Sequence, residues 1–291
     1  MLGQLPTLLR RVALLPSVEA YGRGRGPWRG GVSPIGAEAV AARAAADGRV
    51  RAIRKPERGR MILLNSFALL LDGEHVSLPL PAQRLLAFLA LQDRPVVRAY
   101  AAGTLWYDST EGHALGSLRS ALWRLRRDGY ELVEATRGQL RLAADVGVDF
   151  QEAVSLARGL LDPLADLEDV DVDQRVLSGD LLPDWYDDWV LIERERFHEL
   201  RVRALESVCA RLTEAGKFGK AMEAGLAAVK GEPLRESAHR SLIKVHLAEG
   251  NAAEALRRYR LYQRLVHDRF GIEPSGQMEE LVGGLTSSGK L

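Results

Sequence analysis

The stretch from Glu111 to Asp128, EGHALGSLRSALWRLRRD, has residue types at a spacing that suits a helix in a DNA groove. Its apolar stripe consists of four leucines at helical intervals: Leu115, Leu118, Leu122 and Leu125. The other face carries His113, Ser117, Ser120, Trp123, Arg124 and Arg127, and Arg119 and Arg126 flank the stripe. Arginine binds phosphate or guanine through paired hydrogen bonds, and serine reaches bases or phosphate oxygens. An ordinary solvated amphipathic helix has a similar pattern, so the flanking elements must distinguish the two.

These flanking elements predict a winged helix-turn-helix at residues 61–150. The expected elements, in order, are strands Ile62–Leu71 and His75–Leu80, helices Gln83–Gln92, Arg98–Leu105 and Glu111–Asp128, and strands Glu131–Ala135 and Gln139–Leu142. In such a domain the third helix enters the major groove and the last hairpin is the wing. Arg137 lies at the wing tip, where it is placed to reach a phosphate or the minor groove, although a solvated turn residue is the alternative.

The sequence pattern of residues 151–291 predicts paired helices. The acidic segment Asp162–Asp173 is expected to be a loop, and Leu181–Val190 opens a run of helices. Two segments then align at an offset of 34 residues, with Gly216 matching Gly250 and Ala221 matching Ala255. This is the period of tetratricopeptide repeats, in which small residues recur where two helices cross closely. The predicted fold class is therefore an α+β winged helix-turn-helix followed by an all-α tetratricopeptide-like helical repeat domain.

The first sixty residues are rich in Gly, Arg and Ala and lack the large apolar residues that a core needs. They hold 12 Lys/Arg against 4 Asp/Glu, whereas residues 151–291 hold 19 against 25. A basic N-terminal region and an acidic C-terminal region are typical of nucleic-acid-binding proteins. We expect residues 1–60 to be a disordered basic extension or the product of a misassigned start, with translation beginning at Met61 as the second possibility.

The composition excludes several classes of protein. A single cysteine excludes an internal disulfide framework and suits a reducing cytoplasm. No apolar run approaches the roughly 20 residues that span a bilayer, so we expect a cytoplasmic, nucleoid-associated protein with no membrane partner.

An enzyme is the competing class, but the chain has no GxSxG, HExxH or CxxC motif. We interpret His239 and His246 as core or surface residues instead of a metal pair, and Cys209 as a small core residue. Two hypotheses apply to the acidic and aromatic residues Asp184, Trp185, Asp187, Asp188 and Trp189. One is a sugar-binding site with paired carboxylates, and the other, plainer one is the start of a helix. We expect no catalytic residue, no cofactor and no metal site.

Two blocks resemble a known family. QRLLAFLAL, the Arg98-to-Trp106 segment and SLRSALWRLRRDG resemble the OmpR-type DNA-binding domain of the Streptomyces antibiotic regulatory protein family. LLPDWYDDWVLIERER and EGNAAEALRRYRLYQRLVHDRFGIEPS resemble that family's bacterial transcriptional activator domain. The chain lacks a Walker motif and so resembles the small members, although LLNSFALLL departs from the usual first strand with Gly-Pro-Phe.

The resemblance implies a transcriptional activator that binds direct repeats in double-stranded promoter DNA as a homodimer, recruits RNA polymerase and controls a biosynthetic gene cluster. The DNA-binding residues that we predict are Ser117, Ser120, Arg119, Arg124, Arg127 and Arg137. The alternative is a helical-repeat scaffold or signalling adaptor whose winged helix mediates protein contacts. Salt-dependent binding to promoter DNA distinguishes the two.

Overall fold

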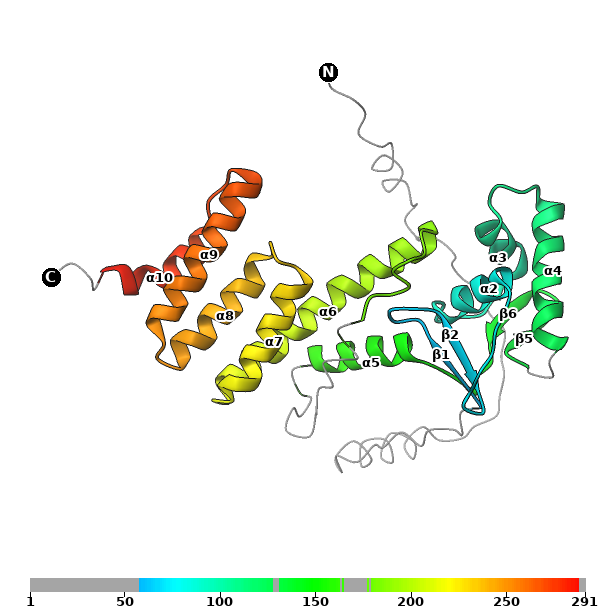
Figure 1. Cartoon of the computed structure of the whole chain (residues 1–291), viewed down its shortest axis with the longest axis horizontal. Coiled ribbons are helices and arrows are strands. Elements are labelled where there is room, and N and C mark those ends of the chain that lie inside the picture. Colours follow the sequence, from blue (N-terminus) through cyan, green and yellow to red (C-terminus); the bar gives the residue numbers. More distant parts are fainter. Residues whose placement is uncertain (1–57, 128–130, 163, 165–176, 178, 288–291) are drawn as a thin grey trace, which may run out of the picture. The chain divides into compact units, whose positions relative to one another are not determined.

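The computed structural model describes residues 58–127, 131–162, 164, 177 and 179–287 (Figure 1). Backbone contacts divide the chain into residues 1–54 and 55–291, and every element described here lies in the second unit. Three of the expectations fall outside the described residues: the extension up to residue 57, the end of the third helix at Asp128, and most of the loop at 162–173.

A four-stranded sheet opens the described part of the chain, with the order β3-β2-β1-β7. Its strands are β1 (Gly59–Ile62), β2 (Ala68–Leu71), β3 (Glu74–His75) and β7 (Val146–Val148). Strand β1 pairs antiparallel with β2 and parallel with β7, with Gly59 opposite Leu71 on one side and Val146 on the other. The first strand of the winged helix is therefore covered on one edge by the last strand before the helical half.

The predicted single strand Ile62–Leu71 is wrong, because the chain reverses between β1 and β2. Asn65 has a φ of 70° in the left-handed region, which a short polar side chain tolerates better than most. The Asn65 backbone N–H donates to the Asp180 backbone carbonyl at 2.7 Å, and the Asp180 backbone N–H donates to the Asn65 side-chain Oδ1 at 3.2 Å. The partner of this turn thus lies far along the chain, where local sequence patterns give no sign of it.

Three helices and a second sheet complete the winged helix. They are α2 (Leu80–Ala90), β4 (Val96–Val97), α3 (Arg98–Leu105), α4 (Glu111–Arg127), β5 (Val133–Ala135) and β6 (Gln139–Leu142), with the sheet order β4-β6-β5. The predicted helix Arg98–Leu105 is confirmed, and α4 begins at the predicted Glu111 and continues to Arg127, where this stretch of described residues ends. The predicted strand His75–Leu80 ends at His75 instead, since Pro79 and Pro81 begin α2. Strand β4 was not predicted.

Helix α5 (Asp149–Leu161) follows β7 directly and is tied to the end of β1 by Asp149. The Asp149 carboxylate accepts hydrogen bonds from the backbone nitrogens of Leu63 at 2.8 Å, Leu64 at 3.1 Å and Phe150 at 2.7 Å. The buried core that begins at Met61 continues through Phe150 to Phe197. One hydrophobic core is therefore shared by the winged helix and the first helices that follow it.

The helical half consists of α6 (Asp188–Glu214), α7 (Phe218–Gly231), α8 (Glu236–Ala248), α9 (Ala252–Phe270) and α10 (Gly276–Ser287). Gly216 and Gly250 have φ values of 70° and 86° in the turns before α7 and α9, a region that glycine adopts without strain. Ala221 and Ala255 are fully buried at equivalent places in these two helices. The predicted tetratricopeptide-like pairing is confirmed.

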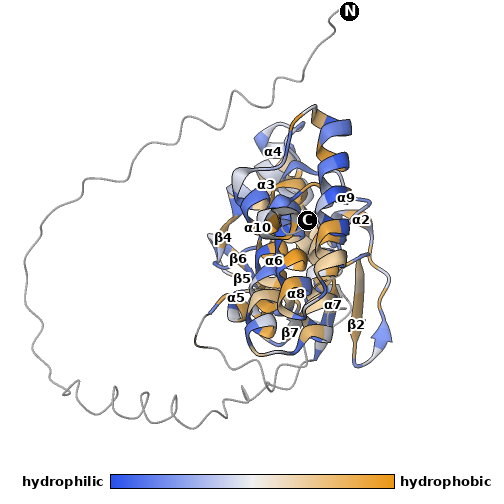
Figure 2. Ribbon diagram, turned by 90° about the vertical axis from the view of Figure 1, so that its left-hand side faces the viewer, coloured by the Kyte–Doolittle hydropathy of each residue, from blue (hydrophilic) through white to orange (hydrophobic). Residues whose placement is uncertain are grey.

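Hydrophilic and hydrophobic residues alternate around these helices, so each has an inward and an outward side (Figure 2). Among the residues that the structure describes, no helix combines the length and apolar character required to cross a bilayer.

Strand β1 is the first described element of the chain, and this gives the first testable prediction. A chain that begins at Arg58 should unfold at the same urea concentration as the full chain, because residues 1–57 lack the apolar residues to form a core. A chain that begins at Met61 should be less stable, since it loses two β1–β7 pairs and the Arg60–Glu152 ion pair at 3.0 Å. Equal midpoints for all three chains would contradict this role of Gly59 and Arg60.

Candidate nucleic-acid interface

Helix α4 packs on the core through the predicted leucine stripe. The buried side chains of this face are Ala114, Leu118, Ala121, Leu122 and Leu125. Leu115 is partly buried and packs against the same core. The apolar stripe predicted from helical spacing is confirmed, and two alanines extend it where α4 approaches neighbouring helices.

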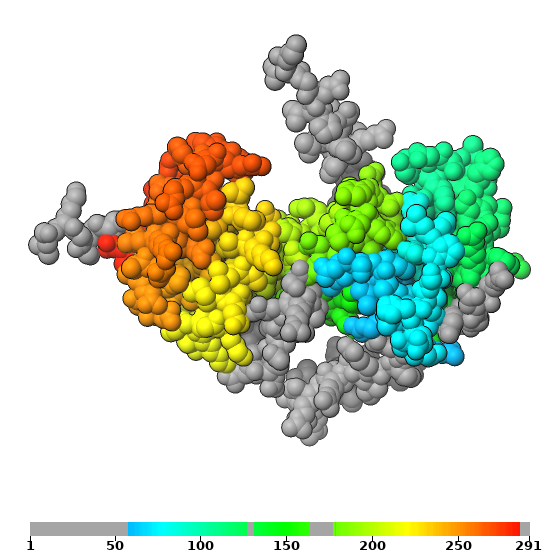
Figure 3. Space-filling view, viewed as in Figure 1, coloured from blue at the N-terminus to red at the C-terminus, as the bar shows by residue number. Residues whose placement is uncertain are grey.

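The opposite side of α4 is open to solvent. Its exposed side chains include Arg119, Ser120, Trp123, Arg124 and Arg126, while Ser117 is partly buried. Arg127 is the last residue of the helix, and its side chain lies outside the described part of the chain. In the space-filling view α4 reaches the surface of the molecule (Figure 3). The four described residues among those predicted in this helix, Ser117, Arg119, Ser120 and Arg124, thus occupy its outer side and margins, with Ser117 nearest the core.

Ser120 is bonded within its own helix. Its hydroxyl donates to the Gly116 carbonyl at 3.1 Å, one helical turn earlier. A serine in this arrangement offers lone pairs to a partner while its hydrogen is engaged. Ser120 is therefore better suited to accept a hydrogen bond, for example from a base amino group, than to donate one to a phosphate.

The wing is a tight turn between β5 and β6 that is fastened to the start of α3. The Arg98 backbone nitrogen donates to the Gly138 carbonyl at 3.0 Å, and Arg98 Nε donates to the Thr136 carbonyl at 2.9 Å. Within the turn, the Gln139 backbone N–H donates to Thr136 Oγ1 at 3.0 Å. Arg137 is exposed on this turn, so its backbone is held while its guanidinium remains accessible.

Arg98 is a positioning residue that the sequence analysis missed. It directly follows β4, whose pairing with β6 places it beside the wing turn. The only signal in the sequence is the pair of valines before it, which is too short to identify as a strand. Helices α2, α3 and α4 pack on one another and on β4 and β6, so the helix face and the wing belong to one packed unit.

The acidic and aromatic residues at 184–189 are a helix start. Helix α6 begins at Asp188, and Asp187 forms an ion pair with Arg84 of α2. Trp189 packs edge-on against Phe88 at 5.3 Å and against Trp185 at 6.2 Å, and both tryptophans pack against the core. The plainer of the two interpretations is confirmed.

The other candidate chemical groups are also structural. Burial raises the pKa of the Cys209 thiol to about 11, which makes it an unreactive core residue as predicted. His239 is buried, its Nε2 lies 2.9 Å from the Pro233 carbonyl, and burial lowers its pKa. Within the described ranges, no group of three or more His, Cys, Asp or Glu side chains is placed to hold a metal ion.

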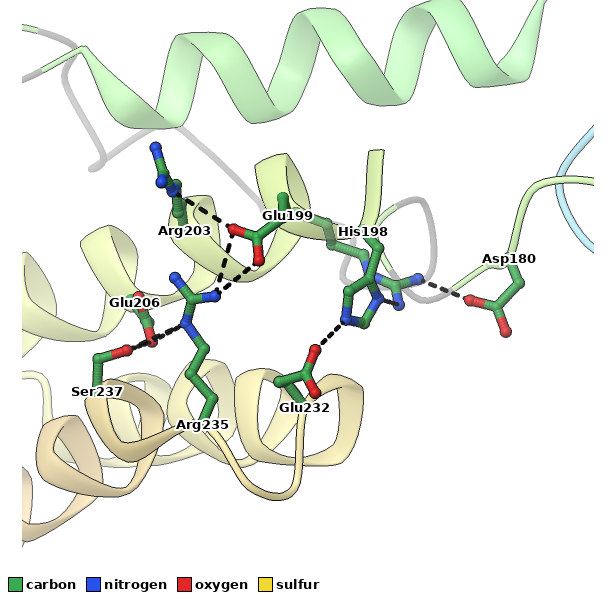
Figure 4. Close-up of polar contacts among 9 residues, drawn as sticks. Asp180, His198, Glu199, Arg203, Glu206, Glu232, Arg235 and Ser237 are labelled. Carbon is green, nitrogen blue, oxygen red and sulfur yellow. Dashed lines mark hydrogen bonds and ion pairs between the residues drawn. The ribbon is translucent and has the colours of Figure 1, made fainter. Parts of the chain in front are cut away.

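A polar network joins α6 to the α7–α8 turn (Figure 4). Arg235 donates to Glu206 at 3.0 Å and to Glu199 at 3.2 Å, and His198 Nε2 lies 2.7 Å from Glu232. Arginine can only donate, so the 3.2 Å contact from Arg201 Nη2 makes His198 Nδ1 an acceptor. His198 then carries its proton on Nε2, facing Glu232. These groups satisfy one another and hold the helices together.

Comparison with known proteins agrees with this architecture. Residues 149–285 match the family profile described as the bacterial transcriptional activator domain. The chain is 30% identical over 230 residues to regulatory protein AfsR of Streptomyces coelicolor, a match that covers 72% of this chain and 22% of AfsR. The chain therefore spans about a fifth of the length of this curated relative.

A solved structure has the same fold. Mycobacterium tuberculosis EmbR, determined in complex with a low-affinity phosphopeptide, superposes with a TM-score of 0.62 at 21% identity. This match covers 80% of the present chain and 66% of the EmbR chain. Residues 149–285 thus match the bacterial transcriptional activator domain, and the chain is similar to AfsR, which is a regulatory protein.

Proposed function

We propose that this protein is a sequence-specific DNA-binding activator that recognises direct repeats in promoter DNA through α4 and the wing. Two protomers occupy neighbouring repeats, and the helical half contacts RNA polymerase to activate a biosynthetic gene cluster. The residues proposed to contact DNA are Ser117, Ser120, Arg119, Arg124, Arg127 and Arg137. The observation that carries the proposal is the arginine-rich outer face of α4, which is held on the core by its leucine stripe.

The charges on this face support DNA as the partner. Among the described residues, the guanidinium groups of Arg119, Arg124 and Arg137 form no ion pair with a carboxylate. Glu111 is the only acid in the α4 sequence. Arginines that are not engaged by the protein remain available for paired hydrogen bonds to phosphate or guanine. Backbone contacts of this kind set register, and base contacts set specificity.

The test of DNA recognition is substitution of Arg124. Arg124→Ala should weaken binding to the cognate site by roughly 1–3 kcal/mol if the side chain reads a base, and the slope of log affinity against log salt should fall by about 1 if it neutralises a phosphate. Fluorescence anisotropy over a salt series measures both quantities. The matched control is Arg257→Ala, which removes an exposed arginine of α9 that pairs with Glu254. Unchanged affinity for Arg124→Ala at moderate salt would overturn the assigned face.

The role of the helical half is tested by removing its last two helices. A chain that ends at Gly250 lacks α9 and α10 and so loses the separate core formed by Tyr262, Val266 and Met278 among others. The core under the winged helix runs from Met61 to Phe197 and keeps all its residues. We expect this chain to retain DNA binding and to lose activation of a promoter-fused reporter. Full activation by the shortened chain would contradict the proposed division of labour.

A further inference from the structure

The outer face of α4 carries an aromatic residue whose position suits contact with a partner. Trp123 is 62% exposed, although a tryptophan side chain brings one of the largest apolar areas to an interface. Ser120 lies one turn before it and Gly116 two turns before it on the same side of the helix. Both neighbours are small, so a partner that docks along this side of the helix can reach the exposed ring.

We propose that Trp123 is a DNA-contacting residue whose indole packs against the apolar surface of the DNA, namely thymine methyl groups or deoxyribose. The inference rests on the proposed function, since it needs α4 to lie in the major groove. In that groove thymine presents its C5-methyl group, which apolar side chains contact directly. Arginines of α4 bind phosphates or guanine, and the indole adds a contact that involves no charge.

The surroundings of Trp123 favour DNA over an apolar protein surface as its partner. The exposed arginines 119, 124 and 126 lie within one turn of it, and a carboxylate occurs in α4 only at Glu111, three turns away. A partner for this patch must therefore combine dense negative charge with apolar surface at close range. Duplex DNA does so, because each groove places phosphates on both sides of the base edges and sugars.

The test uses the full chain and a site obtained by in vitro selection from random duplex DNA. Trp123→Ala should bind that site roughly five- to a hundredfold more weakly. The dependence of affinity on salt should stay that of the unsubstituted protein, because no charge is removed. Trp123→Phe, which keeps an aromatic ring, should recover part of the loss. The melting temperature should change little, since the side chain is mainly exposed. Tyr186→Ala is the control, because Tyr186 is 79% exposed and lies outside α4.

Replacing single thymines of the site by deoxyuridine distinguishes the two apolar surfaces. Loss of one contacted methyl should weaken the unsubstituted protein about fourfold and leave Trp123→Ala unaffected. If no thymine replacement matters but Trp123→Ala is still weaker, the deoxyribose is the partner surface.

Three outcomes overturn the inference. Selection that enriches no sequence overturns the proposed function together with this inference. Equal affinity of Trp123→Ala and the unsubstituted protein overturns the inference alone, as does a loss that is accompanied by a reduced salt slope, because a charge contact would then be responsible.

Discussion

Replacing Asp149 with alanine should lower the free energy of unfolding by about 2–5 kcal/mol, because it leaves the buried backbone N–H groups of Leu63 and Leu64 without acceptors. The Phe150 N–H at the start of α5 loses its acceptor as well. The carboxylate joins the end of β1 to the first turn of α5, so its loss weakens both halves of the shared core. Urea denaturation followed by circular dichroism measures the change.

Two further variants separate the hydrogen bonds from the charge. Asp149→Asn keeps one acceptor oxygen and should lose less stability than the alanine variant. Asp145→Asn is the matched control, since among the described residues its carboxylate forms no hydrogen bond or ion pair. If Asp149→Ala were as stable as Asp145→Asn, the proposed fastening of β1 to α5 would be refuted.

Burial raises the pKa of Asp149 above that of an unfolded chain, although the hydrogen bonds from Leu63, Leu64 and Phe150 and the nearby Arg60 act in the opposite direction. A raised pKa means that the folded state holds this proton more tightly than the unfolded state. The stability from this linkage is fully present below the unfolded pKa and is lost as the pH rises through the folded pKa. As the pH rises from the unfolded-state pKa of Asp149 to its folded-state pKa, the free energy of unfolding of the unsubstituted protein should therefore fall relative to that of Asp149→Asn.

Leu118→Ala should destabilise the winged helix by about 2–5 kcal/mol, because it leaves a cavity beneath α4 at a side chain that is only 1% exposed. DNA binding should then fail on warming at a lower temperature than in the unsubstituted protein. Below that temperature, affinity and salt dependence should remain normal. Thermal melts and anisotropy titrations on one sample separate these effects.

Leu115→Ala provides the control within the same helix. Leu115 is partly buried and packs at the margin of the core, so its truncation should cost less. The reverse order of the two losses would mean that the buried face of α4 is centred elsewhere. Arg124→Ala should weaken DNA binding without unfolding the protein. Comparing it with the two leucine variants therefore separates residues that position the helix from residues that contact DNA.

The elements that were predicted correctly are those set by local sequence. Helices α3 and α4 each have periodic apolar residues, and β6 follows a glycine-containing turn. By contrast, β4 has two residues and β7 has three, and each forms only by pairing with a distant segment. The split between β1 and β2 likewise depends on Asp180, well over a hundred residues away. Periodicity carries no information about such pairings.

The candidate site divides in the same way. A helical wheel is enough to place Arg119 and Arg124 away from the core, because α4 is regular along its length. It does not reveal that the Ser120 hydroxyl is engaged by Gly116 or that Arg98 fastens the wing turn. Both contacts depend on side-chain rotation and on strand pairing, which a sequence of residue types does not specify.

The parallel pairing of β1 with β7 has a consequence for synthesis of the protein on the ribosome. The segment of β1 emerges first, and its partner at Val146–Val148 follows only after the whole winged helix has been translated. Until then one edge of β1 has unpaired backbone groups, which are a template for association with other chains. If translation terminates before residue 146, the truncated chain should aggregate or be degraded. Such a truncated product would then compete poorly with the intact protein.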